Sequence, residues 1–402
     1  MNRHCGFKSF FLGGFESSCH VLRSGRRLDL IAATCHDRFA AADYKRLRSV
    51  GIQTARDGIR WHRIETRPFH YDWSSVLPMV HAAQDTGTQV IWDLCHYGWP
   101  DDLDVFRPEF VKRFTAFARA FASLVFNETD EFSYFAPMNE ISFLSWGAGD
   151  HGILHPFATS RGLELKCQLV RASISAMDAI RNVNPHARFV KVDPLINVVT
   201  DPDASEEQRQ TAAGYTRAQF DAFDMLSGHM WPQLGGHPDY LDIIGANYYV
   251  HNQWVFGGEF IERTDPRYRP LHELLGDLYA RYRKPIFIAE TGIEDDRRPE
   301  WLSYVADEVI IALEKGVPVE GVCLYPIVNH PGWEDERHCH NGLWDYCNDS
   351  GHREIYIPLA EELRRQTARI DSVLRRLRPE PSPLFSGPVL HAEHASAGAA
   401  LR

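Results

Sequence analysis

The sequence has no apolar run long enough to span a bilayer, and its opening residues hold only one short apolar patch. That patch is shorter than the core of a signal peptide. The eight cysteines are scattered along the chain without the close spacing that marks a disulfide framework. These absences argue against a membrane partner and a disulfide-rich secreted domain, and they predict a cytoplasmic protein.

Clustered basic residues are also scarce. The chain has 43 Lys and Arg against 54 Asp and Glu, a formal net charge of -11 and a pI near 6.0. The basic runs at residues 23–27 and 375–378 are short and typical of solvated faces. Because a nucleic-acid surface needs clustered Lys and Arg, we expect no nucleic-acid partner.

The chain is rich in the residues that build a large core, with 44% hydrophobic and 12% aromatic content. Short apolar runs bounded by polar or turn residues predict strands, and longer stretches with helical apolar spacing predict helices. The expected strands are residues 8–15, 52–61, 89–95, 132–138, 187–192, 240–249, 285–292 and 318–325. The expected helices are residues 39–49, 73–86, 108–126, 162–183, 205–225, 271–282, 299–315 and 357–377.

Strand and helix alternate eight times, which predicts a parallel sheet closed into a single (β/α)8 TIM barrel over residues 1–378. No Gly-x-Gly-x-x-Gly pattern follows the first strand, which argues against an open dinucleotide-binding sheet. Residues 379–402 are rich in Pro, Ala, Ser and Gly and are expected to form a disordered tail. Nothing in the sequence indicates an oligomeric state.

Two glutamates stand at expected strand ends. Glu290 closes the apolar run 285–292, and Glu140 follows the strand 132–138. The carboxyl ends of all barrel strands meet on one face, so we expect both carboxylates to face one pocket. Two carboxylates that flank a glycosidic bond can divide the roles of acid and nucleophile, and aromatic rings can stack on a sugar. Further candidates at the strand ends are Arg56, Trp61, His96, Asn139, Asn247, Tyr249 and Trp333.

Five short motifs in the same order resemble those of the family 1 glycoside hydrolases, the β-glucosidase family. Each is weak alone, but their order along roughly residues 7 to 335 is specific. They are Arg-Asp-Gly-Ile-Arg-Trp-His-Arg-Ile at 56–64, Leu-Cys-His-Tyr-Gly-Trp-Pro at 94–100, Phe-Ala-Pro-Met-Asn-Glu at 135–140, Leu-Asp-Ile-Ile-Gly-Ala-Asn-Tyr-Tyr at 241–249 and Ile-Ala-Glu-Thr-Gly at 288–292.

The resemblance implies a retaining β-glycosidase that hydrolyses a small β-glycoside or oligosaccharide without a cofactor or a metal. Glu140 would be the general acid/base and Glu290 the nucleophile. Arg56 and Tyr249 would support the nucleophile. The other substrate-binding residues expected are His96, Asn139, Asn247, Trp333 and Glu334.

Three departures from the family leave the sugar open. The family's Gln at the first strand has no clear counterpart, since Glu16, Cys19 or His20 occupies that region. The family's eighth-strand Glu aligns with Gly332, for which Glu334 is a candidate substitute. The proline after the acid/base is Ile141.

Several alternatives stay open at the level of sequence. Trp61, Trp99 and Trp333 are each either packing residues or sugar platforms. The segment 338–340 (His-Cys-His) with Cys347 matches no standard zinc spacing, and we expect it to form a wall of the pocket. The same catalytic pair would also suit a transglycosidase that passes the glycosyl group to a sugar acceptor. A barrel that binds a glycan without cleaving it is the non-enzymatic alternative.

Overall fold

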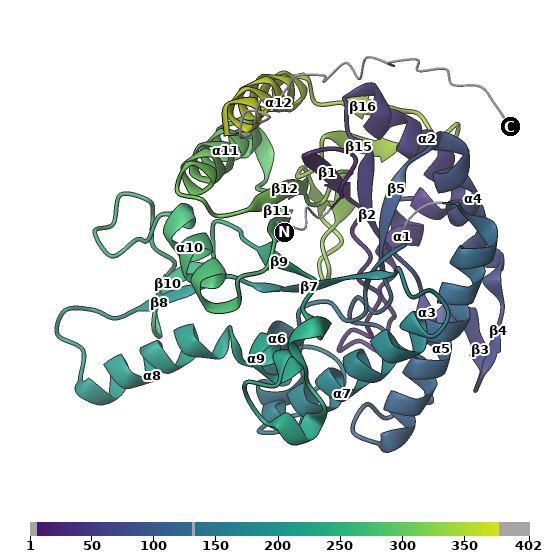
Figure 1. Cartoon of the computed structure of the whole chain (residues 1–402), viewed down its shortest axis with the longest axis horizontal. Helices are drawn as coiled ribbons and strands as arrows, with labels where there is room; N and C mark the ends of the chain where they lie inside the picture. Colours follow the sequence, from purple (N-terminus) through teal and green to yellow (C-terminus); the bar gives the residue numbers. More distant parts are fainter. Residues whose placement is uncertain (1–5, 131–132, 378–402) are drawn as a thin grey trace, which may run out of the picture.

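The barrel predicted from the sequence is confirmed. The computed structural model describes residues 6–130 and 133–377, so the expected tail at 379–402 lies outside the described residues. Eight parallel strands close into one barrel in the order β1-β12-β11-β9-β7-β6-β5-β2 (Figure 1). These strands are β1 (Phe11–Gly14), β2 (Thr54–Gly58), β5 (Gln89–Asp93), β6 (Tyr134–Ala136), β7 (Arg188–Pro194), β9 (Ile243–Asn247), β11 (Ile286–Thr291) and β12 (Val319–Leu324).

The barrel closes through β1, which pairs with β12 on one side and β2 on the other. Gly14 lies opposite Arg56 in this register. A Cβ atom on Gly14 would lie only 2.1 Å from the ring of Tyr325, so the close approach requires glycine. The interior is filled by apolar side chains from alternate strand positions, among them Leu12, Ile91, Val190, Ile243 and Phe287.

An outer ring of helices covers the barrel (Figure 1). These helices are α2 (His36–Ser49), α4 (Leu77–Thr86), α5 (Pro108–Glu128), α7 (Gly162–Arg181), α9 (Asp221–Ser227), α10 (Leu271–Tyr282), α11 (Arg298–Glu314) and α12 (Ile357–Leu377). Shorter helices are α1 (Leu30–Ala33), α3 (Trp61–Ile64) and α6 (Ile141–Leu144), which runs on into the π-helical η2 (Ser145–Asp150). Among the helices of the described part of the chain, none is both long and apolar enough to cross a membrane.

The helix expected at 205–225 is divided into α8 (Glu206–Ala218) and α9. Between them, the side chain of Gln219 bonds the backbone N–H and C=O of Ile196, which ties the break to a neighbouring loop. α8 packs on β8 (Asn197–Val199), and β8 pairs in parallel with β10 (Gln253–Val255). We call α8, β8 and β10 the arm, because they project to one side of the barrel (Figure 1).

Trp61 lies on α3 and not at the end of a strand, so the expected strand 52–61 is shorter than predicted. Its ring is fully buried and packs 5.2 to 5.5 Å from three phenylalanines on one face of α5. Its indole N–H donates to Glu65 at 2.6 Å. Trp61 is therefore a core residue, and the packing alternative left open by the sequence is the correct one.

The remaining short elements lie in the loops. The strands are β3 (Glu65–Arg67), β4 (His70–Tyr71), β13 (His330–Pro331), β14 (His338–Cys339), β15 (Trp344–Cys347) and β16 (Arg353–Ile355). The 3-10 turns are η1 (Trp73–Ser75), η3 (Pro232–Leu234), η4 (Pro238–Tyr240) and η5 (Asp295–Arg297). β13 and β14 pair with each other after β12, and the loop they form borders the carboxyl-end face of the barrel.

Candidate active site

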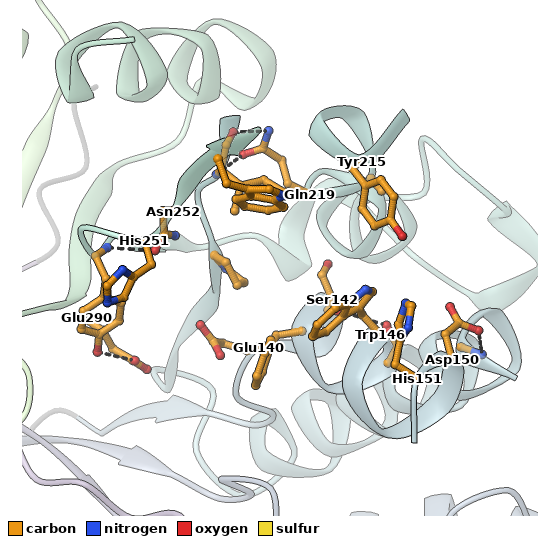
Figure 2. Close-up of a pocket in the computed structure, with 18 of the residues that line it drawn as sticks. Glu140, Ser142, Trp146, Asp150, His151, Tyr215, Gln219, His251, Asn252 and Glu290 are labelled. Carbon is orange, nitrogen blue, oxygen red and sulfur yellow. Dashed lines mark hydrogen bonds between the residues drawn. The ribbon is translucent and has the colours of Figure 1, made fainter. Parts of the chain in front are cut away.

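Glu140 and Glu290 line one cavity of about 1200 Å³ at the carboxyl ends of the strands. Glu290 belongs to β11, and Glu140 follows β6 at the start of α6. Both side chains are buried, with 8% and 5% of Glu140 and Glu290 exposed. Figure 2 shows the two carboxylates at one end of the cavity, with Trp146 and His151 toward the other. The carboxylates expected to face one pocket therefore do so.

Glu290 is held between a cation and a phenol. Arg56 Nη1 donates to Glu290 Oε1 at 2.6 Å, and the Tyr249 hydroxyl donates to Oε2 at 2.9 Å. Arg56 is completely buried and also bonds Asp93 at 2.7 Å. Burial disfavours its charge, but the carboxylates of Asp93 and Glu290 raise the pKa of Arg56 well above its usual value. The guanidinium thus presents a permanent positive charge to Glu290.

Glu140 has a different environment. Asn247 Nδ2 donates to its Oε1 at 2.8 Å, and the hydroxyl of Tyr97 donates to its Oε2. Burial, and next the negative charge of Glu290, raise the pKa of Glu140 to about 8. Its surroundings therefore favour the protonated form of Glu140, whereas Glu290 faces a cation. The two identical side chains therefore lie in opposed electrostatic environments.

The backbone around Glu140 is fixed by Asp193 of β7. Glu140 itself has a left-handed backbone with φ of 43°, and α6 begins directly after it. Asp193 Oδ1 accepts the Ser142 N–H at 3.0 Å, and its Oδ2 accepts the Ser142 hydroxyl at 2.9 Å. A carboxylate at the first turn satisfies backbone donors that the helix cannot pair. Asp193 thereby anchors the turn that carries Glu140.

A second group of polar side chains lies beside the carboxylates. Asn139 Oδ1 accepts from Arg56 at 2.6 Å, and Asn139 Nδ2 lies 3.1 Å from His96 Nε2. His96 Nδ1 contacts Asp93 at 3.2 Å. The hydrogen bond to Asp93 and the charge of Glu16 outweigh the effect of burial and raise the pKa of His96. Arg56, His96 and Asn139 thus form one network with Glu290.

Glu16 lies in the region where the family's Gln is missing and is not among the site residues expected from the sequence. Its Oε1 lies 3.6 Å from His96 Nε2, and it lines the cavity, whereas Cys19 and His20 are buried behind it. Burial is outweighed by the charges of His96 and His330, which lower the pKa of Glu16. An ionised carboxylate therefore lies beside His96 in the cavity, in addition to Glu140 and Glu290. The sequence feature that could have indicated Glu16 is its position as an acidic residue directly after the first strand.

Of three further candidates from the sequence, one lines the cavity and two do not. Trp333 lines the cavity, with its ring 4.9 Å from that of His20. Glu334 is exposed and does not line the cavity, because the loop leaves the cavity after Trp333. Trp99 is buried against Phe110 at 5.7 Å and is likewise outside the cavity lining, as a packing residue.

The segment 338–340 does not form the expected wall of the pocket. Among the described residues, the cavity wall on this side is made by His330, Trp333 and Asn341. His338, His340 and Asp345 bring their ligand atoms within 4.8 Å of one another at the surface. The two cysteines do not join them, since Cys339 Sγ points to a backbone carbonyl of Arg337 and Cys347 Sγ to that of Thr34.

Solved structures share this fold. A family 1 β-glucosidase from Thermotoga maritima superposes with a TM-score of 0.70 at 14% identity, over 90% of this chain and 98% of that one. The β-glucosidase from Thermotoga maritima in complex with noeuromycin gives a TM-score of 0.72 at 15% identity, over 92% and 99% of the two chains. The AHE enzyme from Alicyclobacillus herbarius gives the same values.

No protein-family model and no curated protein sequence matches the chain. At such low identity the structural likeness establishes the barrel fold, and any chemistry has to be argued from the site itself.

Proposed function

We propose that this protein is a retaining β-glycosidase with Glu290 as nucleophile and Glu140 as general acid/base. The observation that carries the proposal is the opposed environment of the two buried carboxylates. Glu290 accepts from Arg56 at 2.6 Å and from Tyr249 at 2.9 Å, while the pKa of Glu140 is raised to about 8. A carboxylate beside a cation and a second, more basic carboxylate in one cavity suit glycoside cleavage by a carboxylate pair, and the family resemblance implies the retaining course by double displacement.

In the first step a Glu290 oxygen bonds the anomeric carbon as the bond to the leaving oxygen breaks, and Glu140 gives its proton to that oxygen. In the second step a water molecule gives a proton to Glu140. The oxygen of that water bonds the anomeric carbon as the bond from this carbon to Glu290 breaks. Both carboxylates return to their starting protonation states. The two inversions at one carbon leave its configuration unchanged.

The polar residues beside the pair are proposed to hold the sugar. Asn139, fixed by Arg56 and adjacent to His96, is suited to the 2-hydroxyl, and His96 to a neighbouring hydroxyl. Glu16 lines the same end of the cavity and is proposed to accept from further sugar hydroxyls. Trp333 is proposed as the stacking face. Asn247 is directed to Glu140 and is proposed to orient the acid.

The test is Glu290→Gly with an activated aryl β-glycoside. The variant should lose hydrolysis, and azide should restore turnover by forming a glycosyl azide, because it replaces the missing nucleophile. Glu361→Ala, on the exposed side of α12, is the matched control and should behave as the parent protein. Hydrolysis by Glu290→Gly at the parental rate would remove Glu290 from the mechanism.

Transfer to a sugar acceptor uses the same pair, and the apolar walls next to Glu140, such as Phe143, favour exclusion of water. Product analysis with and without added acceptor separates transfer from hydrolysis. Glycan binding without cleavage is the alternative suggested by the missing Gln and by Gly332 in place of the family's eighth-strand Glu, and the presence of Glu16 in the cavity weakens the first of these grounds.

A further inference from the structure

The cavity extends well beyond the two glutamates. Its outer part, which we call the outer groove, is bounded by α6, η2 and the start of α7 on one side and by the arm on the other (Figure 2). The apolar residues that line it are Phe143, Trp146, Leu163, Ile196, Tyr215, Ala218, Trp254 and Phe256. At about 1200 Å³ the whole cavity is larger than a single sugar ring needs.

An aromatic path leads from the acid/base into the outer groove. Tyr97, which donates to Glu140, lies 5.9 Å from Phe143, and Phe143 lies 6.0 Å from Trp146 (ring centroids). On the facing wall the rings of Tyr215 and Phe256 are 5.8 Å apart. A group that leaves toward Glu140 therefore enters a space with aromatic surfaces on both walls.

Large apolar side chains are left open to solvent at the groove. Trp146 is 37% exposed and Leu163 is 50% exposed. Burying these surfaces against an apolar ligand would be favourable by the hydrophobic effect. A ligand with an apolar part could therefore bind here by burying the exposed surfaces of these two side chains.

Several polar side chains of the outer groove are already bonded within the protein. A second sugar would need free donors and acceptors here, because its hydroxyls lose hydrogen bonds to water on entry. The two histidines, His151 and His251, pack their rings on Trp146 and Phe260 at 4.7 and 4.5 Å. The internal bonds are Gln219 with Ile196, Asn252 with Leu195, Lys166 with Asp221, Asp150 with Gly162 and Ser142 with Asp193.

We propose that the outer groove binds a large apolar aglycone, an alkyl chain or a fused-ring group, and that the substrate is an amphiphilic glycoside in preference to an oligosaccharide. The inference rests on the proposed function, because it assigns the leaving group of the same reaction. The sugar end near Glu16 and His96 is polar and the groove is apolar, which matches the two ends of an amphiphile.

Hydrolysis of a matched series tests the proposal. The sugar is chosen from a panel of aryl β-glycosides, and the series is its methyl glycoside, its n-octyl glycoside below the micelle concentration, and its β-linked disaccharide. We expect kcat/KM for the octyl glycoside to exceed that for the methyl glycoside by at least about 10-fold, with the disaccharide close to the methyl glycoside. A disaccharide preferred over the octyl glycoside overturns the proposal.

Two variants locate the effect in the groove. Trp146→Ala and Tyr215→Ala should each lower kcat/KM for the octyl glycoside by about 10-fold and leave the methyl glycoside within about 2-fold. Trp231→Ala is the matched control, because Trp231 is 41% exposed and does not line the cavity. An equal loss on both substrates would mean that the two residues do not contact the aglycone.

Binding separates this inference from the proposed function. Calorimetry with n-octyl and methyl β-thioglucoside, which are not hydrolysed, measures the affinity of the outer groove for an alkyl chain without catalysis. Tighter binding of the octyl compound, lost in Trp146→Ala, would support the groove even if no aryl glycoside is cleaved. Cleavage of aryl glycosides with equal binding of the two thioglucosides would uphold the enzyme and overturn the groove.

Discussion

Arg56 Nη1 lies 2.6 Å from Glu290 Oε1, and the guanidinium is completely buried. The same guanidinium bonds Asp93 at 2.7 Å and Asn139 at 2.6 Å, so one cation organises three polar partners at the floor of the cavity. A buried cation of this kind is stable only while its carboxylates surround it. Arg56 therefore links the stability of the barrel to the geometry of the proposed nucleophile.

Arg56→Met should destabilise the protein by about 3–5 kcal/mol, because it leaves the buried carboxylates of Asp93 and Glu290 without their cation. Chemical denaturation measures this loss as a lower midpoint. Arg263→Met is the control, since Arg263 pairs with Glu300 at the surface, and its midpoint should stay unchanged. Equal midpoints for Arg56→Met and the parent protein would contradict the prediction.

The pH profile should report Glu140. Because the pKa of Glu140 is raised to about 8, the acid is protonated below that pH, and kcat/KM should fall as the pH rises through about 8. Glu140→Gln should remove this alkaline limb. Tyr97 donates to the carboxylate and lowers its pKa, so Tyr97→Phe should move the limb to higher pH. Tyr240→Phe, outside the cavity, is the control, and a limb that survives Glu140→Gln would assign it to another group.

Asp193 should act as a positioning residue for the acid. Asp193→Ala removes the acceptor of the Ser142 N–H and hydroxyl, so the turn that carries Glu140 loses its anchor. We expect kcat/KM, which reports the first step, to fall by about 10-fold or more for a phenyl glycoside, which needs the acid, and by much less for a dinitrophenyl glycoside, which does not. Asp193→Asn keeps an acceptor oxygen and should restore part of the rate. Equal losses on both substrates would point to a general structural role.

Lys191 of β7 is expected to lower the free energy of unfolding. It is 2% exposed, and its Nζ has no hydrogen-bond partner among the described residues. Burial, and next the charge of Arg181, lower the pKa of Lys191 from 10.5 to about 7. Lys191→Met should stabilise the protein at neutral pH by about 1–3 kcal/mol, since an apolar chain replaces an unpaired amine.

The pH dependence of that gain has a definite sign. Between pH 7 and 10.5 the unfolded chain binds more protons at Lys191 than the folded one, so this residue makes parental stability rise with pH. The advantage of Lys191→Met should therefore be largest below pH 7 and shrink toward pH 10.5. Thermal denaturation across that range, with the exposed Lys315→Met as control, measures it. An advantage that grows with pH would contradict the burial of the amine.

The barrel could be predicted from the sequence because each strand is a short apolar run that ends in polar residues. The same pattern predicts that Glu290 and Glu140 share one pocket, since a barrel brings strand ends together whatever their separation in the chain. Trp61 was misplaced because an apolar segment reads alike in a strand and in the helix that follows it.

Other contacts depend on the path of loops, which local pattern does not determine. Tyr97 has a left-handed backbone with φ of 67°, and its side chain contacts Glu140 from that position. This conformation is uncommon for residues other than glycine, so the sequence does not predict it. Glu16 enters the cavity through the loop after β1, where the sequence left three candidates open. The break between α8 and α9 depends on Gln219 and Ile196, which are distant in sequence.

The strands of the arm form a sheet of their own, apart from the barrel sheet. Within the described chain, β8 and β10 hydrogen-bond as strands only to each other, while Glu290 lies on β11 of the closed ring of eight and Glu140 follows β6 at the start of α6. An arm transplanted from a related barrel, or lengthened by insertion, would thus reshape one wall of the cavity while leaving the carboxylates in register. Under the proposed function, the wall that binds the leaving group could be exchanged by engineering while the proposed catalytic pair is retained.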